Sequence, residues 1–453
     1  MNSVKAVEVQ RWENWSGSVV SKPAKVMYPR SIEEIILIVK QCNKTNQAIR
    51  VVGSGHSFTS LVATNDLLLS LDLLEGIEHT DRENDIVSVW AGTKLHVLGE
   101  ALHQLGYAQE NLGDINAQSI AGAISTGTHG TGIEFSSLAT QVVEMTVVTG
   151  KGELLECSMD KNTQMFKALQ LSLGALGIIV KLKLKVVPAY KLLLESKRMF
   201  LDDCLQNLDK YKTENRHFEF FWFPYSKYVQ AKFVNKTNDD KTKKNITDSF
   251  NKKFIENGLY RVLSEGCRLI PSLSKSVSRL SGRVVPNERA IDDSYKVFAS
   301  IRDVKFNEME YNIPANQLAN VLTEIRDMIN EKKFPVHFPI ECRYVKRDDI
   351  WLSPAFERDS AYIAVHMYKG MEYKDYFRSV EQICRKYNGR PHWGKMHTLT
   401  AHTLKEVYPY WNEFLLLRND LDPNSLFMNT YLRQLFDIDP TSTTSTNSQL
   451  AGF

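Results

Sequence analysis

The chain has 453 residues, of which 43% are hydrophobic and 24% are charged. A chain of this length exceeds what one hydrophobic core usually supports, so we expect two or three domains of a globular enzyme. The net charge of +3 comes from 56 basic and 53 acidic residues that are dispersed along the sequence. This balance predicts no nucleic-acid partner.

The six cysteines are widely separated and form no CxxC pair, so no zinc spacing is present and we expect no metal site. The first residues contain no apolar secretion-signal segment. The most apolar stretch, 169–187, carries Lys181, Lys183 and Lys185, which argues against a membrane span. Together these features predict a protein with reduced thiols in the cytoplasm. The oligomeric state cannot be inferred from the sequence.

Short helices and strands alternate in the first part of the chain. Ser31 followed by Glu34 is a capping box and predicts a helix start. The β-branched stretch from Ile49 to Val52 is stopped by Gly53 and predicts a buried strand. Further strands are expected at 67–71, 86–91, 142–148 and 154–157, the last two as a hairpin, with a helix at 94–105.

Two glycine-rich stretches lie in this first part, "VVGSGHSF" at 51–58 and "SIAGAISTGTHGTG" at 119–132. Consecutive amides in such loops form a nest for an anion such as a pyrophosphate. Neither stretch is a Walker A sequence or a GxGxxG dinucleotide fingerprint. Tight turns use the same residues, so both interpretations stay open on the loops alone.

The second part of the chain differs from the first in composition and in its hydrophobic pattern. An alternating run at 182–186 ends at Pro188, where we expect a domain boundary. The segment 190–390 is rich in aromatic residues and contains alternating stretches at 308–313 and 340–345, which predict an antiparallel sheet flanked by helices. The Ser/Thr-rich tail 439–453 is expected to be frayed.

Seven stretches resemble, in order, the aldonolactone oxidoreductase and alditol oxidase branch of the vanillyl-alcohol-oxidase-type flavoproteins. They are "WENWSG" (12–17), "VVGSGHSF" (51–58), "NLGDINAQSIAGAISTGTHGTG" (111–132), "LGALGIIVKLKL" (173–184), "ECRYVKRDDIWLSPA" (341–355), "HWGK" (392–395) and "DPNSLFMNTYLRQLF" (422–436). Each motif is modest, but their order is specific. The resemblance covers nearly the whole chain and is weakest in 190–300.

The resemblance implies an α+β protein with a PCMH-type FAD-binding domain of two subdomains and a substrate cap of antiparallel sheet and helices. The FAD-binding domain would comprise 1–188, completed by about 400–438, and the cap 189–399. It assigns cofactor contacts to Gly53, Ser54, Gly55, Ser57, Phe58, Ser119, Gly122, Ser125, Thr126, Gly127, Thr128, His129, Gly130, Ile179, Val180 and His392.

His56 is the residue to which this family would attach FAD covalently, through the 8α-methyl group. A neutral imidazole is a suitable nucleophile for that bond, and alkylation there should raise the flavin potential. A metal ligand would need partners at ligand spacing, which are missing, whereas a general base or a structural histidine in a turn remain alternatives. For His129, a bond to the loop backbone and a flavin contact are equally plausible.

The resemblance places the catalytic residues in the cap. Glu341 and Arg343 alternate on one predicted strand and so share a face, which suits a polyhydroxylated substrate, although a surface ion pair is the ordinary outcome of such spacing. Lys395 would stabilise the anionic reduced flavin or assist deprotonation of the hydroxyl, unless it faces solvent. His366 is expected to be the base or its orienting partner, with a core histidine as the alternative.

Two positions depart from the alditol-oxidising members: Asp114 replaces a serine that contacts substrate, and Tyr368 replaces a small hydroxyl residue. Both favour an aldonolactone. The predicted reaction is therefore FAD-dependent oxidation of the C2 carbinol of a sugar-acid 1,4-lactone, such as L-gulono- or D-arabinono-1,4-lactone, with O2 or another acceptor reoxidising the flavin. An alditol oxidase for xylitol or sorbitol, and a flavin- or carbohydrate-binding protein without turnover, are the alternatives.

Overall fold

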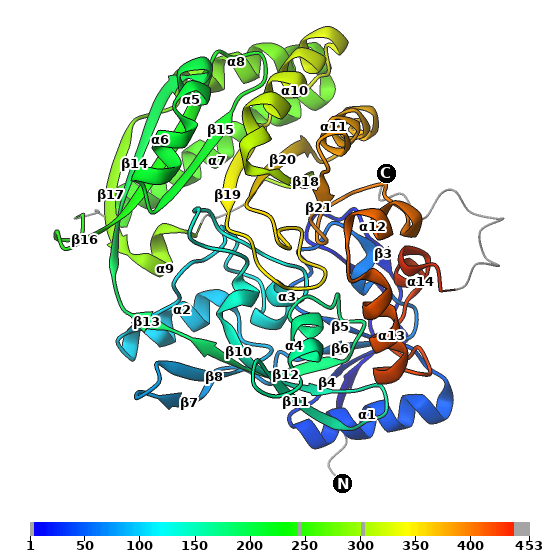
Figure 1. The fold of residues 1–453 in the computed structure, drawn as a ribbon. Coiled ribbons are helices and arrows are strands. Elements are labelled where there is room, and N and C mark those ends of the chain that lie inside the picture. Colours follow the sequence, from blue (N-terminus) through cyan, green and yellow to red (C-terminus); the bar gives the residue numbers. More distant parts are fainter. Residues whose placement is uncertain (1–3, 243–245, 300–303, 439–453) are drawn as a thin grey trace.

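The structure is a computed structural model that describes residues 4–242, 246–299 and 304–438. An N-terminal unit forms the lower half of the molecule in Figure 1, and a large sheet with helices forms a cap above it. The boundary expected near residue 188 falls between β13 (Val187–Pro188) and β14 (Lys191–Phe200). The tail 439–453 lies outside the described residues.

The first sheet of the N-terminal unit has four strands in the order β1 (Lys5–Val7), β4 (Lys25–Tyr28), β6 (Leu67–Ser70) and β5 (Ile49–Val52). β6 pairs in parallel with β4 and β5, and α1 (Ile32–Thr45) connects β4 to β5. The predicted helix start is confirmed, because the Ser31 side chain accepts the Glu34 amide. Glu34 reaches the amide of Arg30 rather than that of Ser31, one residue earlier than a capping box requires.

The second sheet is antiparallel, in the order β11 (Leu154–Ser158), β10 (Val142–Val148), β12 (Ile178–Lys185), β8 (Ile86–Trp90) and β7 (Ile77–Asp81). The predicted β10–β11 hairpin is confirmed, with Gly152 at φ +74° in its turn. The predicted helix is α2 (Leu95–Gln104), which ends before Gly106 at φ +85°, a backbone conformation that favours glycine. Shorter elements complete the unit: β2 (Trp12–Glu13), β3 (Val20–Ser21), β9 (Tyr107–Ala108), α3 (Ile120–Ser125) and α4 (Thr163–Leu169).

The cap is one eight-stranded sheet with every neighbouring pair antiparallel. Its order is β17 (Glu288–Asp293), β14, β16 (Tyr228–Thr237), β15 (His217–Trp222), β19 (Ile340–Val345), β20 (Ser360–Tyr368), β18 (Phe306–Pro314) and β21 (Arg390–Pro391). The antiparallel sheet predicted for 190–390 is therefore present. Its helices are α5 (Leu201–Gln206), α6 (Leu208–Glu214), α7 (Ile246–Leu269), α8 (Ser274–Val284), α9 (Ser294–Val297), α10 (Leu318–Lys332) and α11 (Lys374–Lys386).

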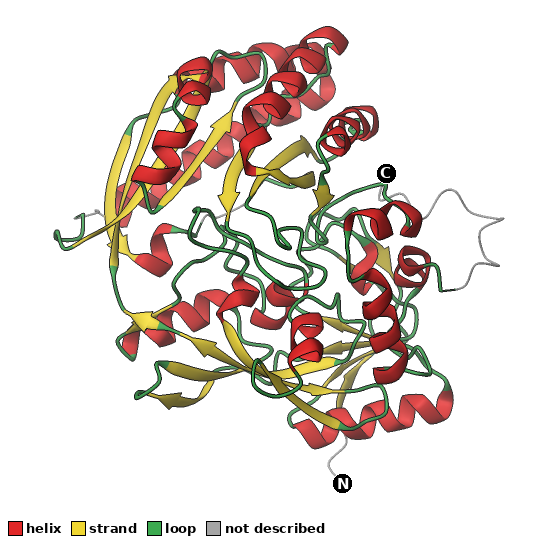
Figure 2. Ribbon diagram, in the orientation of Figure 1, coloured by secondary structure: helices red, strands yellow, loops and turns green. Residues whose placement is uncertain are grey.

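The two faces of the cap sheet differ in chemistry. One face is apolar, and helices pack against it: Tyr211 of α6 contacts Phe218, and the Tyr311 hydroxyl donates to Glu381 of α11 over 2.5 Å. The opposite face carries charged side chains from β15, β18, β19 and β20. These side chains line cavities together with residues of the N-terminal unit, so the charged face is turned toward that unit. Figure 2 shows the strands and helices of the cap above the N-terminal unit.

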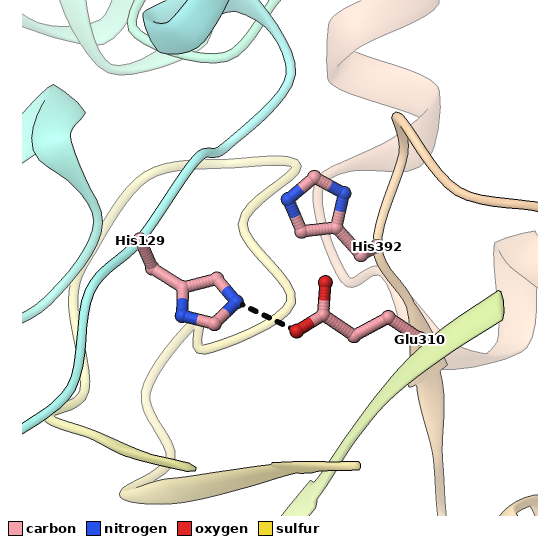
Figure 3. Close-up of side chains that lie close together, drawn as sticks. All are labelled: His129, Glu310 and His392. Atoms are coloured by element: carbon pink, nitrogen blue, oxygen red, sulfur yellow. Dashed lines mark hydrogen bonds and ion pairs between the residues drawn. The ribbon is translucent and has the colours of Figure 1, made fainter. Parts of the chain in front are cut away.

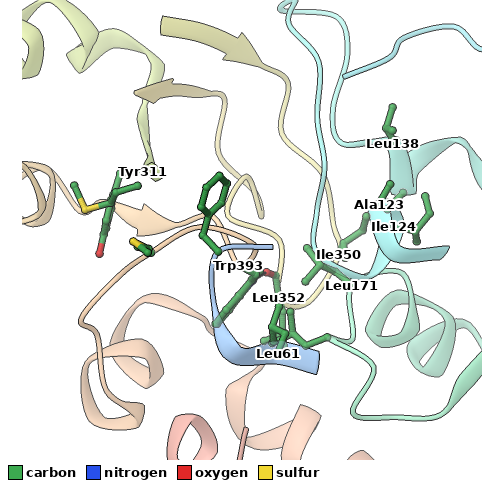
Figure 4. Close-up of a cluster of buried hydrophobic side chains, with 14 of the residues drawn as sticks. Leu61, Ala123, Ile124, Leu138, Leu171, Tyr311, Ile350, Leu352 and Trp393 are labelled. Carbon is green, nitrogen blue, oxygen red and sulfur yellow. Dashed lines mark hydrogen bonds between the residues drawn. The ribbon is translucent and has the colours of Figure 1, made fainter. Parts of the chain in front are cut away.

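A continuous core joins the two units. In Figure 4, Leu61 and Ile124 of the N-terminal unit belong to the same buried cluster as Ile350, Leu352 and Trp393. The Trp393 indole donates to the Leu352 carbonyl over 2.7 Å. Packing of this kind fixes the relative position of the glycine-rich loops and the segment around Trp393.

The C-terminal helices α12 (Ala401–Val407), α13 (Trp411–Leu421) and α14 (Thr430–Phe436) return to the N-terminal unit. Arg50 of β5 is buried and donates to the carbonyls of Leu61, Leu173, Gly174 and Phe427. One guanidinium therefore ties four segments together. No helix in the described part of the chain is both long enough and apolar enough to cross a bilayer.

Candidate functional site

A first cavity runs between the two glycine-rich loops and encloses about 950 Å³, part of it open to solvent. It is lined by ten of the predicted cofactor-binding residues: Gly53, Ser54, Gly55, His56, Ser57, Ser119, Gly122, Ser125, Thr126 and Ile179. Leu71 and Asp72, which follow β6, and Gly92, which follows β8, close it. The two loops thus face one space, although some sixty residues separate them in sequence.

The loops of the first cavity have the shape and the donors for a phosphate-bearing ligand. A Cβ atom on Gly53 would lie 2.3 Å from the Ser119 hydroxyl, so the loops meet closely there. Within the described residues, the amides of Ser54, Gly55, His56 and Ser57 donate to no protein oxygen. Consecutive unpaired amides make an anion nest. These residues therefore fit the pyrophosphate of FAD.

A second cavity lies between these loops and the charged face of the cap sheet. It shares His56, Ser57, Gln118 and Thr126 with the first cavity, so the two spaces meet at His56. It is lined also by Trp15, Phe58, Asp114, Ile115, Thr128, His129, Phe306, Glu308, Glu310, Glu341, Arg343, His366, His392, Gly394 and Lys395. All four predicted catalytic residues, Glu341, Arg343, His366 and Lys395, are brought together here.

Four carboxylates on the sheet face are each paired with a basic side chain; Glu308, Glu310 and Glu341 are buried and Glu219 is partly buried. Glu308 contacts Lys395 at 2.5 Å and His366 at 3.5 Å, and Glu310 contacts His129 at 3.1 Å. Arg343 contacts Glu219 at 2.9 Å and also pairs with Glu341. Buried charges without such partners would cost several kcal/mol each, so the face is stable only as a set of pairs.

The pairs keep the two carboxylates of β18 ionised. Burial alone would raise the pKa of Glu308, but the positive charge of Lys395, with a smaller contribution from the neighbouring His366, holds it well below its usual range. In the same way, His129 outweighs burial and lowers the pKa of Glu310 from 4.5 to about 2. Both groups are therefore anions at any physiological pH and poor proton acceptors.

Figure 3 shows His129, Glu310 and His392 converging from three segments. His129 Nδ1 lies 2.8 Å from the Gly130 carbonyl and Nε2 lies 3.1 Å from Glu310. Both oxygens only accept, so both nitrogens donate and His129 carries the positive charge of the pair. Burial lowers the pKa of His392 to about 4, and its Nδ1 accepts the Gly394 amide.

The ligand atoms of these three residues lie within 4.8 Å of one another, a spacing that also suits a metal ion, which the sequence did not predict. Hydrogen bonds already satisfy both nitrogens of His129 and one nitrogen of His392. The arrangement is therefore explained as an ion pair beside a neutral imidazole.

The turn that carries Lys395 is held between the first glycine-rich loop and β18. Phe58 donates its amide to the Gly394 carbonyl over 2.7 Å, and the amides of His392 and Met396 donate to the carbonyls of Glu310 and Glu308 over 3.0 Å. The Lys395 ammonium lies 5.1 Å from the Phe58 ring centre. This turn therefore places the Lys395 ammonium in the second cavity, close to its junction with the first.

His366 has a defined tautomer. Its Nδ1 lies 3.1 Å from the Pro339 carbonyl, which can only accept, so Nδ1 carries the proton. In the neutral ring Nε2 then presents a lone pair, and it lies 3.5 Å from Glu308. A proton taken up by Nε2 would be stabilised by that carboxylate.

His56 lies in a desolvated and positively charged setting. Trp15 stacks on its ring at 5.7 Å. Burial, together with Lys395 and Lys94, lowers the pKa of His56 from 6.5 to about 4. The imidazole is therefore neutral at physiological pH.

Some predicted residues lie elsewhere. Tyr368 does not line the second cavity; its hydroxyl donates to Glu265 of α7 over 2.5 Å. Gly127 and Val180 line neither cavity, and Gly130 faces a smaller space beside Asp114 and Arg343. Gly127, Val180 and Gly130 were expected at the cofactor because they stand beside other motif residues in the sequence. Their backbones instead pack against Leu171, Ala91 and Asn111, respectively.

The sequence did not single out Glu219, Glu308, Glu310, Trp15 or Gln118, which the structure places at or beside the site. A Glu-x-Glu pattern at 308–310 was available, but alternating charge in a strand usually marks a solvent face. Only the position of β18 inside the cap sheet, between β20 and β21, indicates that this pattern belongs to a site and not to a solvent face.

Comparison with known proteins gives a consistent result. A family model described as D-arabinono-1,4-lactone oxidase matches residues 182–435, and one described as an FAD binding domain matches 23–158. The L-gulono-1,4-lactone dehydrogenase of Mycobacterium tuberculosis is 38% identical, covering 94% of this chain and 98% of that protein. The L-gulonolactone oxidase of Mus musculus is 32% identical with the same coverage.

Solved structures agree on the fold. A structure titled solvent-stable cholesterol oxidase superposes with a TM-score of 0.82 at 17% identity, covering 96% of this chain and 98% of that one. Cholesterol oxidase from B. sterolicum gives 0.78 at 17% identity with the same coverage. At this identity the likeness supports the fold, a PCMH-type FAD-binding domain with a cap.

The Glu310–His129 pair predicts a specific acid response. Because folding lowers the pKa of Glu310 below its unfolded value, the stability it contributes is present above about pH 4.5 and is lost as pH falls toward about 2. We expect Glu310→Gln to flatten the fall of the unfolding temperature between about pH 5 and about pH 3. Glu413→Gln, an exposed site on α13, should keep the wild-type slope. Equal slopes for Glu310→Gln and wild type would refute the pairing.

Proposed function

Since the chain belongs to the D-arabinono-1,4-lactone oxidase family of FAD-dependent oxidoreductases, we propose that it oxidises the C2 carbinol of a sugar-acid 1,4-lactone. L-gulono-1,4-lactone and D-arabinono-1,4-lactone are the representative substrates. The observation that carries the proposal is the second cavity, in which Glu341, Arg343, His366 and Lys395 meet at the edge of the cofactor cavity. The product is a keto-lactone that tautomerises to an enediol, and O2 or another acceptor completes the cycle.

The two glycine-rich loops are the residues that would hold FAD, with the amides of Ser54 to Ser57 toward its pyrophosphate and Thr126 and Gln118 at the junction of the cavities. FAD bound there supplies the two-electron acceptor for the alcohol carbon. The lysine at this junction, Lys395, places positive charge where a reduced, anionic flavin would need it.

Glu341 and Arg343 are the proposed substrate-binding pair. Both lie on one face of β19 and are buried. Arg343 is held on one side by Glu219 and on the other by Glu341, which fixes the direction of its donors. Glu341 accepts from a ring hydroxyl, Arg343 donates to lactone oxygens, and Asp114, from the segment just before the second glycine-rich loop, contacts the same ligand.

His366 is the proposed proton acceptor. Its Nε2 takes the C2 hydroxyl proton, and the Glu308 carboxylate 3.5 Å away stabilises the imidazolium that results. Lys395 shares the same carboxylate at 2.5 Å, so Glu308 positions both groups. A protein that only bound the sugar would have no need for a base with its own counter-ion, which disfavours binding without turnover.

A substrate panel tests this assignment against an alditol oxidase. We expect L-gulono- and D-arabinono-1,4-lactone to reduce the flavin and xylitol and sorbitol to do so at least about tenfold more slowly at equal concentration. The buried Glu341–Arg343 pair is built for a ligand with a carbonyl as well as hydroxyls. Flavin absorbance after mixing is the readout, and oxygen uptake in the same assay identifies the acceptor. Reduction by the alditols alone would overturn the lactone assignment.

We propose further that His56 carries FAD covalently. Three features support it: His56 is at the junction of the two cavities, its pKa of about 4 leaves a neutral nucleophile, and Trp15 orients its ring. A bond at this point would tether the isoalloxazine at the mouth of the second cavity.

The covalent bond has a direct test. Acid-precipitated wild-type protein should show flavin fluorescence in its band on a denaturing gel, and His56→Ala should lose it while retaining flavin that precipitation releases. His96→Ala, an exposed histidine on α2, should keep the fluorescent band. A fluorescent band in His56→Ala would place the attachment elsewhere.

A cytoplasmic location is proposed on the chemistry of the cysteines. All six are buried and free, and none forms a disulfide. Six unpaired thiols are typical of a reducing compartment.

A further inference from the structure

The side chains that line the second cavity carry more negative than positive charge. Among the described residues that line it, four carboxylates face three cations. The carboxylates are Asp114, Glu308, Glu310 and Glu341, and the cations are His129, Arg343 and Lys395. Burial lowers the pKa of His56 and His392 to about 4, which leaves both neutral, and His366 is neutral when it serves as the base. The lining therefore has a net charge of −1 before a substrate enters.

Each of these cations is already paired with a carboxylate. Lys395 and His129 each contact one glutamate of β18, at 2.5 Å and 3.1 Å. Arg343 is held through Nε by Glu219 and through Nη2 by Glu341. The described part of the cavity therefore offers an anionic ligand only positive charge that the ligand must share with these carboxylates.

Asp114 brings the fourth carboxylate of the cavity close to Arg343. It lines the second cavity together with Arg343, and it lines a smaller cavity together with Arg343 and Glu219. The preceding residue, Gly113, packs against the second glycine-rich loop, where a Cβ atom would lie 3.1 Å from a main-chain oxygen. Burial would lower the pKa of Arg343, but Glu341, Glu219 and Asp114 raise it above its usual range. Asp114 thus acts on the charge of this guanidinium.

The charges around Arg343 do not cancel. Lys232 contacts Glu219 at 3.0 Å, so these two charges offset each other. Arg343 is then left with Glu341 and Asp114, which is one cation against two anions. The carboxylate of Asp114 is therefore the charge that makes the surroundings of Arg343 negative.

On the basis of the function proposed above, we propose that Asp114 restricts the second cavity to neutral sugar derivatives and excludes anionic ones such as aldonates. A lactone carbonyl needs one N–H of Arg343 and carries no charge. The carboxylate that forms when the lactone ring hydrolyses would meet the same guanidinium and be repelled by Asp114. Two like charges at about 6 Å in a partly buried site lower affinity at least about tenfold. A repulsive group of this kind separates two ligands that attraction alone would bind alike.

The shape of the ligand is the competing explanation, because hydrolysis opens the ring as well as creating a charge. Sorbitol separates the two effects. It is L-gulonate with the C1 carboxylate reduced to a hydroxymethyl group, so it has the same chain and the same configuration without the charge. Exclusion by charge affects L-gulonate alone, whereas exclusion by shape affects both compounds.

Inhibition of lactone-driven flavin reduction tests the proposal in the flavin-loaded full chain at neutral pH. In wild type, we expect the inhibition constant of L-gulonate to be at least about tenfold higher than that of sorbitol. Asp114→Asn should bring the two constants within about threefold of each other, whereas Asp114→Glu, which keeps the charge, should preserve the difference. The ratio of the two constants is the readout, because it cancels any general loss of ligand binding in a variant.

Glu110→Gln is the matched control. Glu110 is exposed in the segment before Asp114 and lines neither cavity, so this variant loses the same charge elsewhere and should keep the wild-type ratio. Equal inhibition by L-gulonate and sorbitol in wild type would overturn the proposal, as would an unchanged ratio in Asp114→Asn or an equal change in Glu110→Gln. If no lactone reduces the flavin, the proposed function fails instead, and the two compounds are then compared through the shift that each causes in the flavin absorbance.

Discussion

The structure depends on four carboxylates, three buried and one partly buried, on one face of the cap sheet. Glu308, Glu310 and Glu341 are buried and Glu219 is partly buried, and an unpaired buried carboxylate there would cost several kcal/mol. The sheet supplies part of the compensation through Arg343, and the rest comes from outside it. His129 comes from the second glycine-rich loop and Lys395 from the turn after β21. The charged face of the cap can therefore pack against the N-terminal unit only when the second glycine-rich loop and the Lys395 turn are in place to pair its carboxylates.

The same charge pairs also fix the positions of the groups that would bind the cofactor and accept the proton. The turn bearing Lys395 bonds to the first loop through Phe58 and to β18 through the amides beside Lys395, so one short segment relates the cofactor cavity to the proton-accepting histidine. His56 is the residue at which both cavities meet. The charge pairs, more than any single catalytic side chain, thus hold the two units in the relative position that the reaction requires.

Much of this was predictable from the sequence, and the exceptions have physical reasons. Local signals such as the Ser31 cap, the 49–52 strand and the hairpin of β10 and β11 were sufficient for their elements. The face shared by Glu341 and Arg343 follows from strand alternation. Glu308 and Glu310 were missed because their pattern is that of an exposed strand. They are buried because β18 lies between β20 and β21 in the sheet and the cofactor loops cover this face. Tyr368 was placed in the site from its spacing to His366, but Glu265 of α7 holds its hydroxyl away.

The most direct test of the account is anaerobic mixing of the flavin-loaded protein with L-gulono-1,4-lactone, for wild type and for His366→Gln with matched flavin content. We predict that the wild-type flavin bleaches and that His366→Gln bleaches at least about a hundredfold more slowly, because it lacks the base that Glu308 supports. A flavin that stays oxidised in the wild type, or an unchanged rate in His366→Gln, would contradict the central claim that the charged face of the cap oxidises the lactone.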